Sequence, residues 1–196
     1  MEIDNKELIK INLGCGKDFR KGWINVDENR EVKADVYCDF SKEKLPFKDN
    51  YADEILLDNV LEHIRPEKYF AFMEEVWRVA KPDAPIIIYV PHYSGMYALK
   101  HPTHYMYFGI GSMDIFTPEG VFNGERYSKA RFIVEKEKLL FFHHNLGMYT
   151  LSKLPLNWPL NFGRLWQLLM ERFNLFGFDE IKYILLAKKD VEVIKK

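Results

Sequence analysis

Five short, mostly apolar runs divide the first 90 residues of the chain. They span Ile9–Leu13, Trp23–Val26, Val36–Cys38, Glu54–Leu57 and Ile86–Val90. Runs of this length and composition are typical of buried parallel strands. Between the last two runs, apolar residues recur at helical spacing from Tyr69 to Ala80, with Pro66 suited to the first turn and Pro82 beyond the end. This alternation of strand and helix predicts an α/β fold, an open parallel sheet with helices on its faces.

The pattern changes after Pro91. Residues 92–128 show no sustained periodicity, and we expect them to form a lid or cap over the sheet. Two further strands are predicted at Arg131–Phe142 and Ile181–Lys188. The aromatic-rich insertion 141–178 between them contains a predicted helix that ends at Gly177.

The connection between the first two predicted strands is unusually short. Only nine residues, 14–22, separate them, whereas a parallel crossover usually needs about a dozen. We therefore expect its helix to be reduced to a turn or two.

The amino-acid composition limits the number of domains, the partners and the location that we expect. A chain of 196 residues with 47% hydrophobic content predicts a single domain over 1–196. The formal net charge of −1 gives no reason to expect a nucleic-acid partner. The charged first residues and the lack of a long apolar run predict no secretion signal and no transmembrane segment, hence a cytoplasmic protein. Cys15 and Cys38 are expected to be reduced thiols, because a strand should separate them.

The candidate chemistry begins at Gly14-Cys15-Gly16, directly after the first run. Glycines allow positive φ and let a ligand approach main-chain N–H groups. Asp27 ends the second run, where a carboxylate accepts hydrogen bonds from ribose hydroxyls in nucleotide-binding units. A nicotinamide-dependent oxidoreductase is disfavoured. Phe19 stands in place of a third glycine, and Asp27 follows Gly14 by 13 residues instead of about 20.

Five motifs in order extend this pattern. They are I-N-L-G-C-G at 11–16, N-V-D at 25–27, C-D-F at 38–40, the L-P-F to N-V-L-E-H-I block at 45–64, and W-R-V-A-K-P at 77–82. Over residues 9–91 the chain resembles a class I S-adenosylmethionine-dependent methyltransferase of the type 11 group. The resemblance implies a Rossmann-like, seven-stranded, mostly parallel sheet in the order 3-2-1-4-5-7-6. Its seventh strand would be antiparallel, and helices would lie on both faces.

The resemblance also implies roles in binding S-adenosylmethionine. Main-chain groups near the glycines would hold the methionine carboxylate and ammonium, Asp27 both ribose hydroxyls, and Asp39 with the Phe40 N–H the adenine. Asn59 and Val60 would line the methionine moiety. Many family members have an acidic residue where Asn12 stands, so one contact to the ammonium is expected to be neutral or absent. The cofactor residues are Gly14, Cys15, Gly16, Asp27, Asp39, Phe40, Asn59 and Val60.

Methyl transfer depends mostly on alignment and exclusion of water, with a general base where the acceptor is a hydroxyl or a protonated amine. The candidate bases are His92, His101 and His104. The same three imidazoles have alternative interpretations, as an open zinc site or as packing of the lid, and we do not expect a bound metal. We expect His63, in L-E-H-I, to be structural or to face the cofactor.

The sequence as a whole predicts methyl transfer to an oxygen or nitrogen of a small-molecule or glycan-type acceptor. The alternative is a non-catalytic module that binds S-adenosylmethionine or S-adenosylhomocysteine as a sensor or assembly partner. Residues 141–178 are expected to complete the core or to form a homodimer surface. The alternative, an amphipathic helix touching a membrane or another partner, is weakened by the few basic residues there.

Overall fold

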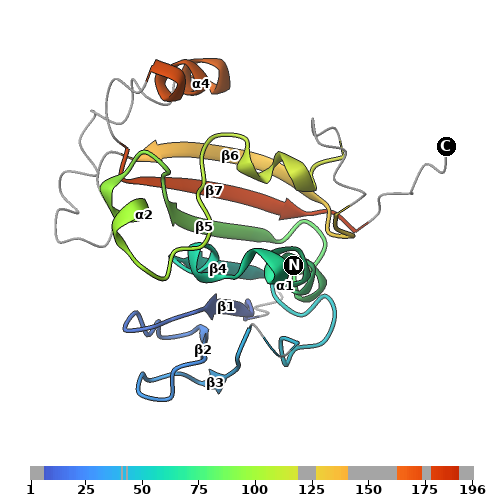
Figure 1. Cartoon of the computed structure of the whole chain (residues 1–196). Helices are drawn as coiled ribbons and strands as arrows, with labels where there is room; N and C mark the ends of the chain where they lie inside the picture. The colour runs from blue at the N-terminus through green and yellow to red at the C-terminus, as the bar shows by residue number, and fades with distance from the viewer. Residues whose placement is uncertain are drawn as a thin grey trace.

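Seven strands form one mixed sheet in a computed structural model that describes residues 7–40, 42, 44–118, 127–140, 163–173 and 178–189. The strand order is β3-β2-β1-β4-β5-β7-β6 (Figure 1). β7 runs antiparallel to both of its neighbours and the other pairs are parallel. The strands are β1 Lys10–Leu13, β2 Ile24–Asp27, β3 Val36–Tyr37, β4 Glu54–Asp58, β5 Pro85–Pro91, β6 Phe132–Leu140 and β7 Glu180–Ala187. The predicted order and the antiparallel seventh strand are confirmed.

Among the described residues, three α-helices and two 3-10 turns accompany the sheet. They are η1 Leu61–His63, α1 Pro66–Val79, α2 Met96–Lys100, η2 Ser112–Phe116 and α4 Arg164–Phe173. α1 begins at the predicted Pro66, whose missing N–H costs nothing in a first turn. α4 confirms a helix within 141–178, but its predicted end at Gly177 and the predicted strand residues 141–142 lie outside the described part of the chain. Within that part, no helix is long and apolar enough to cross a membrane.

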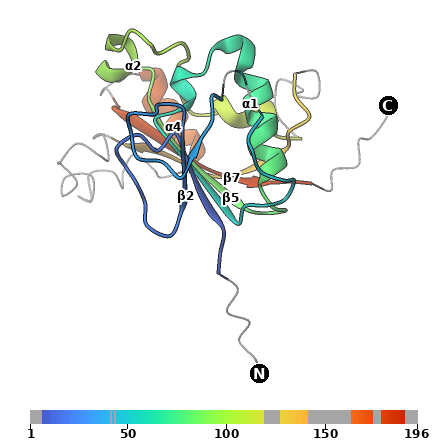
Figure 2. The same cartoon turned by 90° about the horizontal axis from the view of Figure 1, so that it is seen from below.

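The sheet buries one face more completely than the other. α1 and α2 lie on the same side of it (Figures 1 and 2), and the side chains of Ile86, Ile88 and Leu185 are fully buried. Their neighbours along the same strands, Ile87 and Ile184, are partly exposed. Right-handed crossovers explain the asymmetry. The β1–β2 connection and the β4–β5 connection run in opposite directions across the sheet, so they cover opposite faces.

The β1–β2 connection contains no helix. Residues 14–23 form turns and bends, with Gly14, Gly16 and Gly22 at positive φ, so the expectation of an abbreviated helix was wrong. These ten residues are too few for both a helix and the return to the next strand. The loop instead folds back in successive turns, which need the left-handed conformations that glycine adopts without strain.

Two buried asparagines replace the hydrogen bonds that a helix would have made internally. Asn12 and Asn25 are paired across β1 and β2. The Asn12 Nδ2 donates to the Asp18 carbonyl at 2.8 Å and to the Asn25 Oδ1 at 3.3 Å. Asn25 also accepts the Arg20 N–H at 2.8 Å and donates to the Arg20 carbonyl at 3.0 Å and to Asp35 at 2.9 Å. These bonds satisfy loop groups that would otherwise be buried without partners.

Replacing Asn25 should therefore destabilise the fold. We expect Asn25→Ala to lower the free energy of unfolding by about 2 kcal/mol or more, because several buried groups lose their partner at once. The matched control is Asn29→Ala, an exposed asparagine whose side chain makes a single turn bond to the Glu31 N–H. It should cost less than about 1 kcal/mol. Urea unfolding followed by circular dichroism measures both, and equal losses would contradict the role of Asn25.

Candidate functional site

A cavity of about 450 Å³ opens at the carboxyl ends of β1, β2 and β4. This edge is where open α/β sheets bind their ligands. The lining residues come from the strand ends, from η1 and from the segment after α2. They are Gly14, Asp27, Glu28, Phe40, Asn59, Val60, His63, Ile64, Arg65, Thr103 and Tyr105.

Gly14 is required at its position for two separate reasons. Its φ is +68°, a left-handed conformation that side chains disfavour. A Cβ there would also lie 2.5 Å from the Val60 Cγ2. The loop after β1 therefore contacts the Val60 side chain directly, and the two residues share one wall of the cavity.

Asp27 combines a structural role with exposure to the cavity. Its Oδ2 accepts the Gly16 N–H at 2.7 Å, and its Oδ1 accepts the Asn29 N–H at 2.8 Å. A carboxylate has about four lone-pair sites, so both oxygens retain capacity for ligand hydroxyls. The same bonds fix the loop of Gly16 beside the end of β2.

Asn59 follows β4 in a left-handed conformation, with φ of +56°. Its N–H donates to the Tyr89 carbonyl at 2.9 Å, and its side-chain amide donates to Asp58 at 2.8 Å. Asparagine tolerates this region better than other non-glycine residues. Conformations of this kind cluster at ligand sites, where the surrounding structure imposes them.

Five of the eight predicted cofactor residues line this cavity, namely Gly14, Asp27, Phe40, Asn59 and Val60. Cys15, Gly16 and Asp39 are not among its lining residues, and Asp39 pairs with Lys42 at 2.7 Å.

The N–H groups of Gly14 and Cys15 donate to the Val26 carbonyl, and that of Gly16 donates to Asp27. These three donors are therefore used within the protein. The predicted contact of the methionine group with them stays a prediction.

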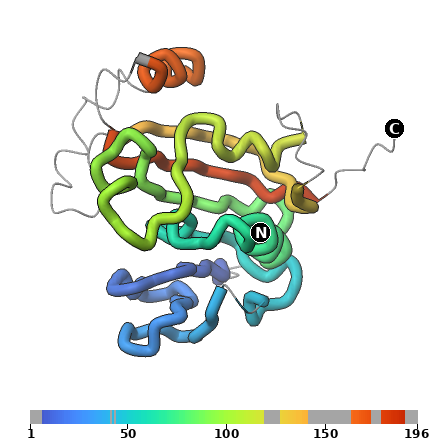
Figure 3. The backbone as a smooth tube through the Cα atoms, in the orientation of Figure 1, coloured from blue at the N-terminus to red at the C-terminus, as the bar shows by residue number. Residues whose placement is uncertain are grey.

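Sequence reasoning missed the far wall of the cavity. Thr103 and Tyr105 reach it because the Tyr105 N–H donates to the Glu62 carbonyl at 2.7 Å. The Arg65 guanidinium lies over the Tyr105 ring, 5.2 Å from its centroid. Figure 3 shows the segment between β5 and η2 passing alongside η1. The H-P-T-H motif was the one sequence signal for this contact.

The predicted catalytic histidines occupy two different places. His92 is fully buried, with its Nε2 2.7 Å from Glu171 of α4 and its Nδ1 2.8 Å from the Ser94 hydroxyl. The same Glu171 oxygen accepts the Ile110 N–H at 2.7 Å. His92 therefore helps to attach α4 to the end of β5, and it does not line the cavity.

His101 and His104 lie beside His63 instead. The ring centroids are 4.7 Å apart for His63 and His104, 5.4 Å for His63 and His101, and 4.7 Å for the stacked pair His101 and His104. Burial lowers the pKa of His63 and of His104 below the ordinary value, and a neighbouring imidazole lowers each further. These rings therefore favour the neutral form.

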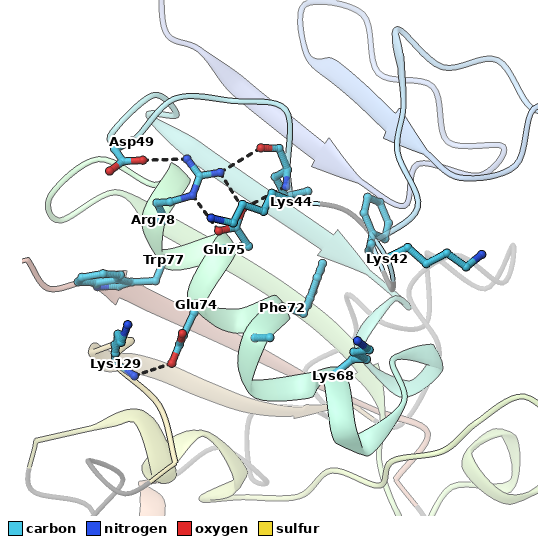
Figure 4. Close-up of a pocket in the computed structure, with 13 residues that line it drawn as sticks. Lys42, Lys44, Asp49, Lys68, Phe72, Glu74, Glu75, Trp77, Arg78 and Lys129 are labelled. Carbon is cyan, nitrogen blue, oxygen red and sulfur yellow. Dashed lines mark hydrogen bonds and ion pairs between the residues drawn. The ribbon is translucent and has the colours of Figure 1, made fainter.

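A second cavity of about 520 Å³ lies along the outer side of α1 (Figure 4). Its central charge is Arg78, which donates to Glu75, to Asp49 and to the carbonyls of Leu45 and Phe47. These contacts hold the segment before β4 against the helix. Arg78, Glu75 and Asp49 are engaged with one another, and Glu74 accepts the Lys129 N–H, so we assign this cavity a structural role.

Glu62 is buried beside the first cavity without a hydrogen bond to either carboxyl oxygen in the part of the chain described. Its exposure is 1%. Burial, with a smaller contribution from the carboxyls of Asp58 and Glu180, raises its pKa to about 8. Glu62 is therefore mostly protonated at neutral pH.

This protonation makes the stability of the fold depend on pH. The folded state holds a proton that the unfolded chain releases above its ordinary pKa, so the free energy of unfolding should fall as the pH rises from about 5 to about 8. Glu62→Gln keeps a neutral group and should be more stable than the wild type at pH 8 by on the order of 2 kcal/mol, with little difference at pH 5.

Urea unfolding at the two pH values measures the effect. Glu67→Gln, an exposed first-turn residue of α1, is the matched control for the loss of charge. An equal response of the two variants would show that Glu62 is not protonated in the folded state.

The sequence and the fold are similar to those of known proteins. The methyltransferase domain family matches residues 12–88. An uncharacterized protein of Methanocaldococcus jannaschii is 28% identical over 104 residues, which span 44% of this chain and 42% of that protein.

Two solved structures share the fold. One is a SAM-dependent methyltransferase from Archaeoglobus fulgidus, 20% identical with a TM-score of 0.54, which covers 93% of this chain and 87% of that one. The other is the putative methyltransferase of Haloferax volcanii in complex with the Trm112 methyltransferase activator. It is 15% identical with a TM-score of 0.56, and the coverage is 93% and 84%. The match to the methyltransferase domain family covers residues 12–88, and the solved structures show that the chain shares its fold with these two proteins.

Proposed function

We propose that this chain transfers the methyl group of S-adenosylmethionine to an oxygen or nitrogen of a small-molecule or glycan-type acceptor. The observation that carries the proposal is the single cavity that joins Gly14, Asp27 and Val60, from three different strand ends, to Thr103 and Tyr105. Gly14, Asp27 and Val60 would line the half of the cavity that binds the methyl donor. Thr103 and Tyr105, with His63, would line the half that binds the methyl acceptor.

The charges of the cavity suit the donor. S-adenosylmethionine carries a sulfonium, an ammonium and a carboxylate. Asp27 and Glu28 supply acidic groups on the lining, and Arg65 supplies a cationic one. Burial raises the pKa of Glu28, and the nearby Asp39 and Asp27 raise it further. Asp27 would accept the ribose hydroxyls, as its position at the end of β2 predicts.

When bound, S-adenosylmethionine supplies an activated methyl group, whose bond to sulfur breaks as the bond to the acceptor forms. The task left to the chain is to align the acceptor and exclude water. Thr103 and Tyr105 close one side of the cavity and fit this task. We propose that residues 92–128 act as the predicted lid.

The predicted homodimer surface gains one supporting observation. On α4 the polar side chains of Gln167 and Glu171 face the protein, and each makes a hydrogen bond to it. The exposed side chains of this helix include Leu165, Trp166, Leu168 and Leu169. We keep the interface between two copies through 141–178 as a proposal, because apolar helix faces of this kind commonly mark interaction sites.

Binding of the donor should depend on the small size of Gly14. Gly14→Ala places a methyl group against Val60 and should lower the affinity for S-adenosylmethionine about tenfold or more, a loss of about 1.4 kcal/mol of binding free energy. Gly22→Ala is the matched control. Its φ of +80° imposes the same backbone strain, but its Cβ meets nothing within 4 Å. Isothermal titration with S-adenosylmethionine measures both, and equal affinities would exclude this cavity as the donor site.

Asp27→Ala should remove measurable donor binding while the circular dichroism spectrum stays that of a folded protein, because the ribose hydroxyls lose their acceptor. Unchanged affinity would refute the donor assignment. A screen with methyl-labelled donor against hydroxyl and amine acceptors then tests catalysis. Tight binding with no transfer to any acceptor would favour the sensor function.

A further inference from the structure

Three imidazoles converge at the edge of the cavity. One ring nitrogen from each of His63, His101 and His104 lies within 4.8 Å of the other two. His63 ends η1, whereas His101 and His104 follow α2 almost 40 residues later. His63 and the intervening Thr103 both line the cavity. The cluster is therefore a product of the fold at the edge of the proposed methyl-transfer site.

Each of the three rings makes its hydrogen bonds with the Nδ1 atom. The His104 Nδ1 lies 3.2 Å from the Ala98 carbonyl, and the His63 Nδ1 lies 3.2 Å from the Thr103 carbonyl. A carbonyl only accepts, so both rings carry their proton on Nδ1 and present an unprotonated Nε2.

Thr103 orients the third ring. Its hydroxyl oxygen is 2.9 Å from the Nδ1 of His63 and 2.9 Å from the Nδ1 of His101. With two lone pairs it accepts from both rings at once. Histidines that bind metals are held in this way, with one nitrogen donating to a protein oxygen and the other on the metal.

The remaining contacts of the cluster favour a cation over an ion pair. No carboxylate forms a salt bridge with His63, His101 or His104 among the residues that the structure describes; there, the histidine paired with a carboxylate is His92. A divalent cation would accept one nitrogen lone pair from each of the three rings.

The spacing suits a three-histidine centre. Tetrahedral zinc binds imidazole at about 2.0–2.1 Å, which sets the bound nitrogens about 3.3 Å apart. Small rotations of His101 and His104, which lie on an irregular segment after α2, would close the remaining gap. Three protein ligands also leave a fourth position open, as in catalytic zinc sites.

We propose that His63, His101 and His104 bind one divalent cation of the zinc type beside the cavity, with an open position for an oxygen of the methyl acceptor. The sequence favoured no metal, and its zinc alternative used His92 as the third ligand. The fold places His63 there instead. The second half of the proposal, the contact with the acceptor, rests on the proposed methyl transfer.

The cation would act on the acceptor before transfer. A hydroxyl bound to it loses its proton to solvent more readily, because the positive charge stabilises the oxygen anion. The oxygen lone pair then forms the new bond to the methyl carbon. The carbon–sulfur bond breaks with its electron pair left on sulfur, which turns the sulfonium into a thioether. No oxidant or reductant is needed.

Metal binding is tested on the full chain produced without a histidine tag and stripped with a chelator. Titration with Zn²⁺, followed by calorimetry, and with Co²⁺, followed by its visible absorption, should each show one equivalent. His101→Ala, an exposed residue whose loss should not affect folding, should weaken Zn²⁺ binding by a factor of about 100 or more. Lys100→Ala, its exposed neighbour, should bind as the wild type does.

Thr103→Val separates a metal site from simple packing of imidazoles. It keeps all three ligands but removes the hydroxyl that orients two of them, and should weaken Zn²⁺ binding about tenfold. Absence of a stoichiometric site in the wild type, or binding that His101→Ala leaves unchanged, would overturn the proposal.

Donor binding by the stripped protein keeps the two proposals distinguishable. S-adenosylmethionine should bind with or without Zn²⁺, and transfer to hydroxyl acceptors should require the metal. Zn²⁺ binding by a protein that transfers no methyl group would leave the metal site standing and refute the proposed function. Transfer to a hydroxyl at full rate without metal would refute the role of the cation.

Discussion

The ten-residue connection between β1 and β2 is the constraint on which the cavity depends. Two adjacent parallel strands must be joined across the sheet, and so short a loop cannot satisfy its own backbone groups with a helix. Asn12 and Asn25 supply the missing partners from inside the sheet. Because they fix the loop, Gly14 contacts Val60 and the Gly16 N–H reaches Asp27. The architecture of the loop and the wall of the cavity are one hydrogen-bonded unit.

η1 connects this unit to the rest of the site. It follows the strained Asn59 and Val60, and these two residues and His63 at the end of η1 all line the cavity. The Glu62 carbonyl accepts the Tyr105 N–H, and His63 contacts Thr103. The segment after α2 is therefore positioned by the backbone and side chains of η1. The buried Glu62 carboxyl between these contacts is held neutral, because ionising it there would leave a charge without a partner.

The three histidines predicted as candidate bases lie in two different parts of the structure. His92 is used for assembly, since Glu171 joins it to α4 and to the backbone of Ile110. His101 and His104 face η1, where both rings lie edge-on to the ring of His63. The proposed methyl transfer starts from an already activated sulfonium, so it depends on positioning of the acceptor more than on strong acid or base groups. A cluster of oriented lone pairs next to the cavity suits that requirement.

The sequence by itself determined the strands of the first 90 residues, the start of α1, and Gly14 and Asp27 as candidate ligand residues. These are local properties, because strand ends and glycine turns depend on consecutive residues. The sheet order and the choice of Phe40, Asn59 and Val60 came from the resemblance to the type 11 methyltransferases. The missing β1–β2 helix, the separation of His92 from the other histidines, and the contacts of His63 with Thr103 were decided by tertiary structure. They depend on which segments meet across the fold, and side chains some 40 residues apart carry no local pattern that predicts their distance.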